Sequence, residues 1–404
     1  MSTHDVLVIG GGVSGAAFAA QAARAGRRVL VCEREHAVGG SLRSVREPQG
    51  FWYELGAHTC YNSYGALLEL LEGVDLLGAL QPRGKAVLRF LDGDRVLPGA
   101  NLGLLLRRFD KLELLRAVPR WFGAQAAGKT VREHYEALVG KGNYDRVLGP
   151  MLAAVPSQCP DDFPAEMLFK KRPRRRDVLR SFTLPGGLAT AVEALLATPG
   201  VQLRSGCAVA TLERTPSGFA AGLADGERIE ASVAALAVPP AAAASLLGRA
   251  APELAAEIGG LGEVRIDSLG FAVRRERLDL PYATFLVPLD DVFHSVVTRD
   301  VVPDPTWRGF TFHFRPGIAR EARIERAARV LGVGRADLHG LAERVGVLPS
   351  PVRGHAQRVA AIDRGLAGQA LALCGNWFGG LSIEDCCLRA RSEWARVAAL
   401  PAAG

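Results

Sequence analysis

The first thirty residues change their hydrophobic pattern in regular steps. Residues 5–9 (DVLVI) form an apolar run, residues 10–15 are rich in glycine, and residues 16–24 are dense in alanine up to Gly26. A second apolar run, residues 28–33 (RVLVCE), follows directly. Short apolar runs bounded by glycine are typical of buried strands, and a longer one that stops at a glycine is typical of a helix. The pattern therefore predicts a strand, a tight turn, a helix and a second strand.

Strand-like segments return much later in the chain. Residues 201–203 with 209–212, and then residues 233–238, are apolar enough to extend the same sheet, and residues 370–374 precede a further helix. Such a return of strands after a long interval indicates a domain built from separate pieces of the chain.

Two segments of a different character interrupt these strands. Residues from about 65 to 180 are rich in leucine and arginine with helical spacing, and residues from about 265 to 315 alternate and carry β-forming residues. We therefore predict an α/β fold in which an α+β domain is inserted through a discontinuous first domain, with a cleft between them. The predicted bounds are 1–65, 181–260 and 352–404 for the first domain, and 66–180 (helical part) and 261–351 (β-sheet part) for the second.

The glycine-rich turn carries the strongest chemical signal. Gly10, Gly12 and Gly15 supply a GxGxxG pattern, with Val13 and Ser14 between them, after a predicted strand and at the start of a predicted helix. These glycines permit a tight turn, a close approach of backbone to a pyrophosphate, and close packing of the helix on the strand, while the free amides at the helix start face the phosphates. The turn therefore predicts dinucleotide binding.

The residues after the second strand narrow the choice of dinucleotide. Glu33 ends that strand, where a carboxylate accepts hydrogen bonds from ribose hydroxyls and repels the extra phosphate of NADP. A second glycine pair follows at Gly39 and Gly40, and Arg43 offers a charge-assisted contact to phosphate. Because an NAD domain has no need of this second pair, the sequence favours FAD.

The order of five segments resembles the superfamily of flavin amine oxidases, protoporphyrinogen oxidases and phytoene desaturases. The resemblance covers most of the chain and implies a Rossmann-like FAD-binding domain with an inserted α+β substrate domain. The protoporphyrinogen oxidase branch is the most similar, although residues 360–368 lack a proline- and tyrosine-containing segment common there. The five segments are the GxGxxG turn and residues 39–43 (GGSLR), 54–58 (ELGAH), 184–188 (LPGGL) and 374–386 (CGNWFGGLSIEDC).

The resemblance also assigns roles to single residues. Residues 56–58 are expected near the flavin ring, and Val209 near the adenine. Ser41 stands where similar sequences have Arg or Lys, so one pyrophosphate contact is weaker or comes from Arg43. The helix that starts near Ser382 is expected to turn free amides toward the flavin and to stabilise negative charge on its reduced form. The expected cofactor-binding residues are Gly10, Gly12, Val13, Ser14, Gly15, Glu33, Arg34, Gly39, Gly40, Ser41, Arg43, Gly56, Ala57, His58, Val209, Gly375, Asn376, Leu381, Ser382 and Ile383.

The composition restricts the possible partners and cofactors but does not indicate a function. The net charge of +7 is small for 404 residues, and no nucleic-acid motif accompanies it, so nucleic acid is not an expected partner. We expect the basic run 170–176 (KKRPRRR) to form a solvated surface. The alternative is contact with anionic lipid or with a carboxylate-bearing substrate. Seven scattered cysteines show no metal-ligand spacing and fit the cytoplasm, and none matches a flavin-linking position, so we expect noncovalent FAD and no metal.

The sequence therefore predicts an FAD-dependent oxidoreductase that oxidises or desaturates a sizeable, largely apolar small molecule by hydride transfer, with oxygen as one candidate acceptor. Two alternatives stay open: an amine or amino-acid oxidase on the same fold, and a redox-neutral isomerase or mutase. Similar amine oxidases commonly hold a lysine near the flavin from a strand of the substrate domain, and no lysine follows Lys171 in this chain, so the resemblance disfavours an amine-oxidase site. His58 is a weak catalytic candidate, because a buried histidine with a structural hydrogen bond is the favoured interpretation. Candidate lining residues of the substrate site, each more easily explained as core, are Trp52, Tyr53, Tyr61, Phe285, Phe310 and Phe312.

Overall fold

The first sheet is built from strands that lie far apart in the sequence. In the computed structural model, which describes residues 4–84, 86–97 and 102–401, seven strands pair in the order β10-β2-β1-β13-β12-β11, with β19 beside β13. The pairs among β10, β2, β1, β13 and β19 are parallel, and β11 and β12 add an antiparallel hairpin. The strands are β1 (His4–Ile9), β2 (Val29–Glu33), β10 (Val201–Ser205), β11 (Val209–Thr215), β12 (Gly218–Leu223), β13 (Arg228–Leu236) and β19 (Leu371–Leu373).

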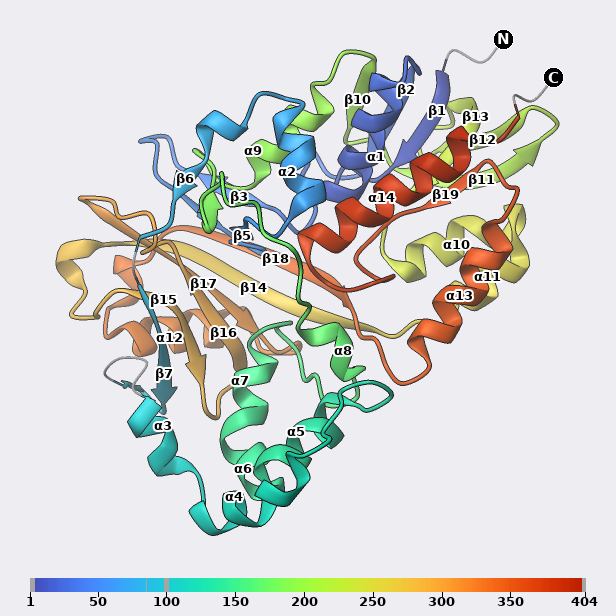
Figure 1. Cartoon of the computed structure of the whole chain (residues 1–404). Coiled ribbons are helices and arrows are strands. Elements are labelled where there is room, and N and C mark those ends of the chain that lie inside the picture. The colour runs from blue at the N-terminus through green and yellow to red at the C-terminus, as the bar shows by residue number, and fades with distance from the viewer. Residues whose placement is uncertain (1–3, 85, 98–101, 402–404) are drawn as a thin grey trace.

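Helices cover both faces of this sheet, and the burial of β1 shows why. Val6 and Val8 face one hydrophobic cluster while Leu7 and Ile9 face another, so the strand is apolar on both sides, as parallel strands require. Figure 1 shows α1 and α14 side by side over one face. That face carries α1 (Val13–Arg24), α2 (Gly65–Glu72), α9 (Ala189–Leu196) and α14 (Ile383–Ala398), and the other carries α10 (Pro240–Ala250), α11 (Pro252–Gly259) and α13 (His355–Leu366).

The second large sheet has the order β18-β14-β17-β16-β15-β7-β8. Its core is aromatic: Phe271, Phe310, Phe312 and Phe314 are fully buried against helix α12 (Arg320–Leu331). Every pair is antiparallel except β15 with β7. The strands are β7 (Val87–Asp92), β8 (Arg95–Val96), β14 (Glu263–Arg274), β15 (Ala283–Pro288), β16 (Phe293–Thr298), β17 (Trp307–Phe314) and β18 (His339–Pro349).

A helical part lies at the end of the molecule opposite the first sheet (Figure 1). Two small sheets, β3 with β4 and β5-β9-β6, lie in the connections. The helices are α3 (Leu102–Arg108), α4 (Lys111–Ala117), α5 (Val131–Val139), α6 (Lys141–Asn143), α7 (Gly149–Ala153) and α8 (Ala165–Leu168), and the short strands are β3 (Ser44–Arg46), β4 (Trp52–Glu54), β5 (Cys60–Tyr61), β6 (Gln81–Pro82) and β9 (Ser181–Thr183). Single helical turns are η1 (Leu77–Ala79), η2 (Val118–Arg120), η3 (Tyr144–Leu148), η4 (Arg275–Arg277) and η5 (Arg335–Asp337).

The structure corrects two sequence-based expectations. Residues 66–180 are not helical throughout, because β7 and β8 lie within them and complete the second sheet beside β15. The leucine content of that stretch fits a strand as well as a helix, and pairing with β15 decides between them. Helix α12 lies inside the segment expected to be a sheet. No helix among the described residues is long and apolar enough to cross a membrane.

Candidate functional site

A cavity of about 1120 Å³ lies between the first sheet and the edge strand β18 of the second. Ile9 and Glu33, which end the parallel strands β1 and β2, line it, so it opens at the carboxyl edge of the sheet. This is where ligands bind in open α/β sheets. The cavity is therefore the candidate cofactor site.

The two glycine segments form one continuous backbone surface on the cavity wall. Gly10 has φ +110°, and a Cβ there would lie 2.4 Å from the carbonyl oxygen of Ala237. At Gly15 a Cβ would lie 1.9 Å from the carbonyl oxygen of Gly10, so α1 packs against the turn only without a side chain. The amide of Gly39 donates to the carbonyl of Gly11 (3.0 Å), which joins the two segments. Such a cradle fits a pyrophosphate, whose approach needs bare backbone.

Glu33 is fixed by backbone hydrogen bonds at the cavity wall. Its carboxylate accepts from the amides of Gly11 (2.6 Å) and Glu35 (2.9 Å). A carboxylate has about four acceptor sites, so two such bonds leave capacity for ribose hydroxyls. The same side chain thus orders the glycine turn and presents an acceptor to the cavity.

The start of α14 also lines the cavity, next to the start of α1. The Ser382 hydroxyl accepts from the amide of Asp385 (3.2 Å), and Asp385 bonds back to the Ser382 amide in a capping box. The first two helical amides, of Ile383 and Glu384, have no intrahelical acceptor by geometry. They are the donors left for a ligand at this helix end.

Two residues of the basic run 170–176 contribute to this helix end, while Lys171, Arg174 and Arg176 are exposed as expected. Lys170 (2.9 Å) and Arg172 (2.8 Å) both pair with the buried carboxylate of Asp385. Burial by itself would raise the pKa of Asp385. Hydrogen bonds from Ser382 and Lys170, together with the nearby Arg172, outweigh burial and lower this pKa. The expectation of a solvated run is wrong for these two residues, because they neutralise an acidic group beside the cavity.

Most predicted cofactor-binding residues line the cavity. The exceptions are Gly15, Gly39, Gly56, His58 and Ser382, and of these His58 lines a separate, smaller pocket. The predicted residues on the wall are Gly10, Gly12, Val13, Ser14, Glu33, Arg34, Gly40, Ser41, Arg43, Ala57, Val209, Gly375, Asn376, Leu381 and Ile383.

Sequence reasoning missed the contribution of β18 to the cavity. Ala342, Glu343, Arg344, Val345 and Val347 line it from the second sheet. Val345 and Val347 are exposed apolar side chains, a sign that something else covers this edge. The only signal in the sequence was an apolar alternation, which does not tell which sheet edge meets the cofactor domain.

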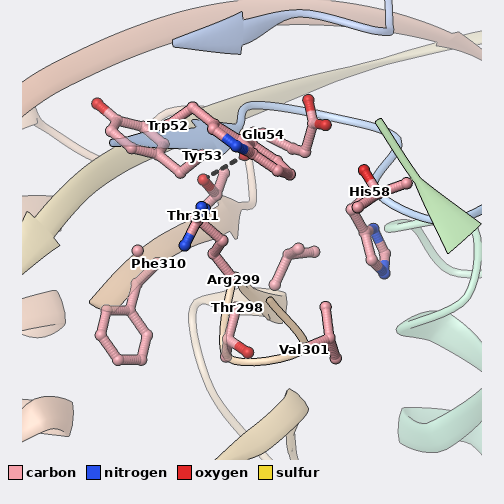
Figure 2. Close-up of a pocket in the computed structure, with 12 residues that line it drawn as sticks. Trp52, Tyr53, Glu54, His58, Thr298, Arg299, Val301, Phe310 and Thr311 are labelled. Carbon is pink, nitrogen blue, oxygen red and sulfur yellow. Dashed lines mark hydrogen bonds between the residues drawn. The ribbon is translucent and has the colours of Figure 1, made fainter. Parts of the chain in front are cut away.

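A second, much smaller pocket of about 10 Å³ lies deeper, between β4 and the strands β16 and β17. It has room for about one water molecule. Figure 2 shows Trp52, Arg299 and Thr311 on one side of it and His58 on the other. The Thr311 hydroxyl donates to the carbonyl of Glu54 (2.6 Å), and the Arg299 guanidinium lies 4.6 Å from the ring centre of Trp52. Trp52, Tyr53 and Phe310 line this pocket, although Phe310 also belongs with Phe312 to the buried core of the second sheet; Tyr61 and Phe285 line neither pocket.

Two ionisable residues at the small pocket have strongly shifted pKa values. Burial raises the pKa of Glu54 to about 7, although its carboxylate accepts from Ser44 Oγ (2.6 Å) and the Leu188 amide (2.7 Å). Burial, with repulsion from Arg83 and His313, lowers the pKa of His58 to about 3. A histidine with this pKa is neutral at pH 7 and a weak base, so the structure gives no support for proton transfer by His58.

Arg83 lies beside His58 with an incompletely satisfied charge. Its Nε and Nη2 atoms are buried and have no hydrogen-bond partner among the described residues. Burial lowers the pKa of Arg83, and Tyr61 and Cys60 oppose that shift. A buried guanidinium without an acceptor is costly unless a ligand supplies one.

The fold and the cavity define a dinucleotide-binding α/β protein, and comparison with known proteins identifies its family. The model of the family "flavin containing amine oxidoreductase" matches residues 13–276, more than half of the chain. The chain therefore belongs to this family, and it is a flavin-dependent oxidoreductase. This confirms the superfamily that the sequence motifs indicated.

Curated relatives match over short segments only. The chain is 32% identical over 76 residues to a 15-cis-phytoene desaturase of Synechococcus elongatus, covering 19% of this chain and 16% of the relative. It is 28% identical over 122 residues to a protein described as a flavin-containing monoamine oxidase A of Dictyostelium discoideum, covering 30% of this chain and 26% of the relative. Because each match spans less than a third of the relative, it does not fix a substrate.

Solved structures match over nearly the whole chain and confirm the predicted fold class. A protein described as a protoporphyrinogen oxidase from Exiguobacterium sp. 255-15 has a TM-score of 0.75 at 19% identity, covering 98% of both chains. Reduced UDP-galactopyranose mutase has a TM-score of 0.74 at 14% identity, covering 98% of this chain and 95% of the other. Wild-type putrescine oxidase bound to putrescine has 0.66 at 16%, with coverages of 98% and 99%. Identities this low show the fold alone.

Proposed function

We propose that this protein binds FAD noncovalently in the large cavity. The observation that carries the proposal is the pair of glycine segments joined on one wall, with the Glu33 carboxylate beside them. When bound, the flavin accepts a hydride from substrate. Cys386 lines the cavity, but burial raises the pKa of its thiol to about 12, so the thiol stays protonated and unreactive.

The identity and linkage of the cofactor are tested by heat denaturation of the purified protein. FAD, and not FMN, is expected in the supernatant, measured by chromatography and mass spectrometry. Colourless protein that takes up NAD in place of FAD would reject the proposal. Flavin that remains with the precipitate would reject noncovalent binding.

We further propose that the substrate is a sizeable, largely apolar molecule that is oxidised or desaturated, as in the protoporphyrinogen oxidase branch. Among the described residues, no lysine lines either the large cavity or the small pocket. The cations there are arginines, and a guanidinium stays protonated and cannot replace an amine that gives up its proton. Oxidation of such a substrate breaks a C–H bond, and the hydride would pass to the bound flavin while a proton from the neighbouring atom would leave to water, because His58 is a weak base.

Arg83 lines neither the large cavity nor the small pocket, but its charge acts on His58, which lines the small pocket, and we propose that its guanidinium binds an acidic group of this substrate. Its unpartnered nitrogens match the two oxygens of a carboxylate. We expect Arg83→Met to weaken binding of an apolar carboxylic acid, measured by titration, and to leave binding of the corresponding amide unchanged. Equal affinities of the variant and the wild type for the acid would remove Arg83 from the proposal.

Two alternative functions remain distinguishable by experiment. An amine or amino-acid oxidase would show rapid flavin reduction by simple amines. A redox-neutral isomerase or mutase would convert substrate without net oxidation or reduction of its flavin. The structural likeness to UDP-galactopyranose mutase is the reason to test this class. Oxygen as the electron acceptor is tested by whether air restores the oxidised flavin spectrum after reduction.

We also propose that contact with an anionic membrane surface involves the helical part. Five large apolar side chains are exposed close together in the sequence there, and Phe122 is 86% exposed. The same stretch carries five exposed cations but only two acidic residues, and one of these, Glu113, accepts from the amides of Gly142 and Asn143. Aromatic and leucine side chains among cations are typical of interfacial segments. The apolar residues are Leu106, Leu112, Leu115, Trp121 and Phe122, and the cations are Arg107, Arg108, Lys111, Arg116 and Arg120.

Vesicle flotation tests this surface. Wild-type protein is expected to float with vesicles containing phosphatidylglycerol and less with pure phosphatidylcholine, and the double variant Leu115→Glu/Phe122→Glu is expected to lose binding. Leu203→Glu, an exposed leucine on β10, serves as control. Equal flotation of the double variant and wild type would reject the surface.

A further inference from the structure

Four arginines line the large cavity, and only one of them has no partner among the residues that the structure describes. Arg34, Arg43 and Arg46 each donate to a protein oxygen, at 3.4, 3.0 and 2.8 Å respectively. For Arg344 the described part of the chain offers no hydrogen bond or ion pair to the guanidinium. Because this side chain is only partly exposed, water does not fully solvate its charge.

The position of Arg344 explains why it faces the cavity. Strand β18 is at the edge of the second sheet, where Arg344 pairs with Ser268 of β14 on one side only. The neighbouring carboxylate of Glu343 is already paired with Arg320 (3.2 Å). Arg320 of α12 thus neutralises Glu343. Arg344 keeps a positive charge that no ion pair among the described residues of this edge compensates.

The charges around Arg344 leave a place for an anion. Burial first, and then repulsion from Arg43, lower the pKa of Arg344, while Glu35 and Glu33 oppose the shift. An arginine nevertheless remains charged in a protein. Two guanidinium groups that repel each other across a cavity are stabilised by an anion between them. Of the two carboxylates near Arg344, Glu33 is held by backbone amides and Glu35 is paired with Arg34 (3.4 Å), so neither is free to serve as that anion.

The chemistry of the glycine loop indicates which anion this is. The pair Gly39 and Gly40 is followed by the uncharged Ser41, so the loop itself brings a single cation, Arg43, to the cavity. A pyrophosphate carries two charged phosphate groups, and a guanidinium matches each with a forked pair of donors. Arg34 and Arg46 also line the cavity but are paired with Glu35 and Glu193, so Arg344 is the cation that is left for the second phosphate.

We propose that Arg344, reaching across from the second sheet, is a binding residue for the pyrophosphate of the dinucleotide and works as the partner of Arg43. The proposal rests on FAD binding in the large cavity. It makes the cofactor a link between the two sheets, because one phosphate-binding cation comes from each. Loss of Arg344 thus removes a contact to the phosphates and none to the adenosine.

Titration calorimetry with FAD-stripped, full-length protein separates these contacts, with FAD, ADP and adenosine as the probes. Arg344→Ala is expected to weaken ADP and FAD binding about 10- to 100-fold and to leave adenosine binding unchanged. Arg344→Lys keeps the charge but loses the fork, so a smaller loss is expected. Arg265→Ala is the matched control, since Arg265 is exposed on the neighbouring strand β14 and does not line the cavity.

Three results would overturn the proposal. The first is unchanged ADP affinity of Arg344→Ala when Arg43→Ala loses affinity. The second is an equal loss for adenosine and ADP, which would place Arg344 at the nucleoside. The third is an equal loss in Arg265→Ala, which would indicate a general charge effect. If Arg344→Ala does not fold, unchanged ADP affinity in both Arg344→Lys and Arg344→Gln is the contradicting result. Wild-type protein that binds none of the probes would reject FAD binding itself.

Discussion

The two walls of the large cavity differ in how they are made. On the side of the first sheet the wall is backbone, shaped by the glycine turns at residues 10–15 and 39–40, which lie in one βαβ segment of the chain and its following loop. On the side of the second sheet the wall is side chains of an edge strand, and the small pocket beyond it is made of buried charged and aromatic groups. Local sequence determines the first wall, whereas the second depends on how distant segments pack. The predictions below test this difference.

The largest expected effect is at Gly15. A Cβ added there would lie 1.9 Å from a backbone oxygen that cannot move without distorting the turn. Gly15→Ala is therefore expected to lower the free energy of unfolding by more than about 3 kcal/mol and to abolish flavin retention. Gly248→Ala in α10 is the control, because a Cβ there meets nothing within 4 Å. A Gly15→Ala protein that purifies with a full complement of flavin would contradict the close packing.

The next largest effect is expected at Glu54, which lines the small pocket. Its pKa is about 7 in the folded state, against 4.5 for an unperturbed glutamate, so the folded state holds a proton that the unfolded state loses between these values. The contribution of Glu54 to stability is thus fully present below pH 4.5 and is lost as the pH rises toward 7, by about 3 kcal/mol. Denaturant titrations of wild type and Glu54→Gln are expected to converge or cross over this range, and parallel pH profiles would contradict the assignment.

Glu33→Ala also tests the backbone wall of the cavity and is expected to have a smaller effect than Gly15→Ala. Loss of a ribose acceptor is expected to weaken FAD binding by about 1–3 kcal/mol, measured by titration into apoprotein, while the fold survives. Because Glu33 also accepts from Gly11 and Glu35, part of the loss comes from a looser turn. Glu35→Ala, at a side chain that lines the same cavity but is 64% exposed, is the control and is expected to bind FAD as wild type does. Unchanged affinity in Glu33→Ala would show that Glu33 is not the ribose ligand.

The smallest effect compares two capping boxes of the same chemistry. Ser382 caps α14 at the cavity, and Thr130 caps α5 in the helical part. Each replacement by alanine is expected to cost about 1 kcal/mol of unfolding free energy. Only Ser382→Ala is expected to weaken flavin binding as well, because only its helix end faces the cavity. Equal flavin affinities for both variants would remove the α14 helix end from the cofactor site.

The first sheet and its glycine turns were predictable from sequence, because each element carries a local signal. The run from Asp5 to Glu33 holds a strand, a turn and a helix within about thirty residues, and the capped start of α14 follows a short apolar strand. Strand β7 was not predictable, since Val87–Asp92 becomes a strand only through its pairing with β15. The pairing of Lys170 with Asp385 joins residues more than two hundred positions apart and has no local signal.

The central claim, a flavin oxidoreductase for an apolar substrate and not for simple amines, is tested most directly by anaerobic spectra of the purified protein. The absorption band of the oxidised flavin is expected to persist with primary amines, polyamines and free amino acids, and to bleach with a larger conjugated or porphyrinogen-like compound. Rapid anaerobic bleaching by a simple amine would contradict the account and establish the amine-oxidase alternative.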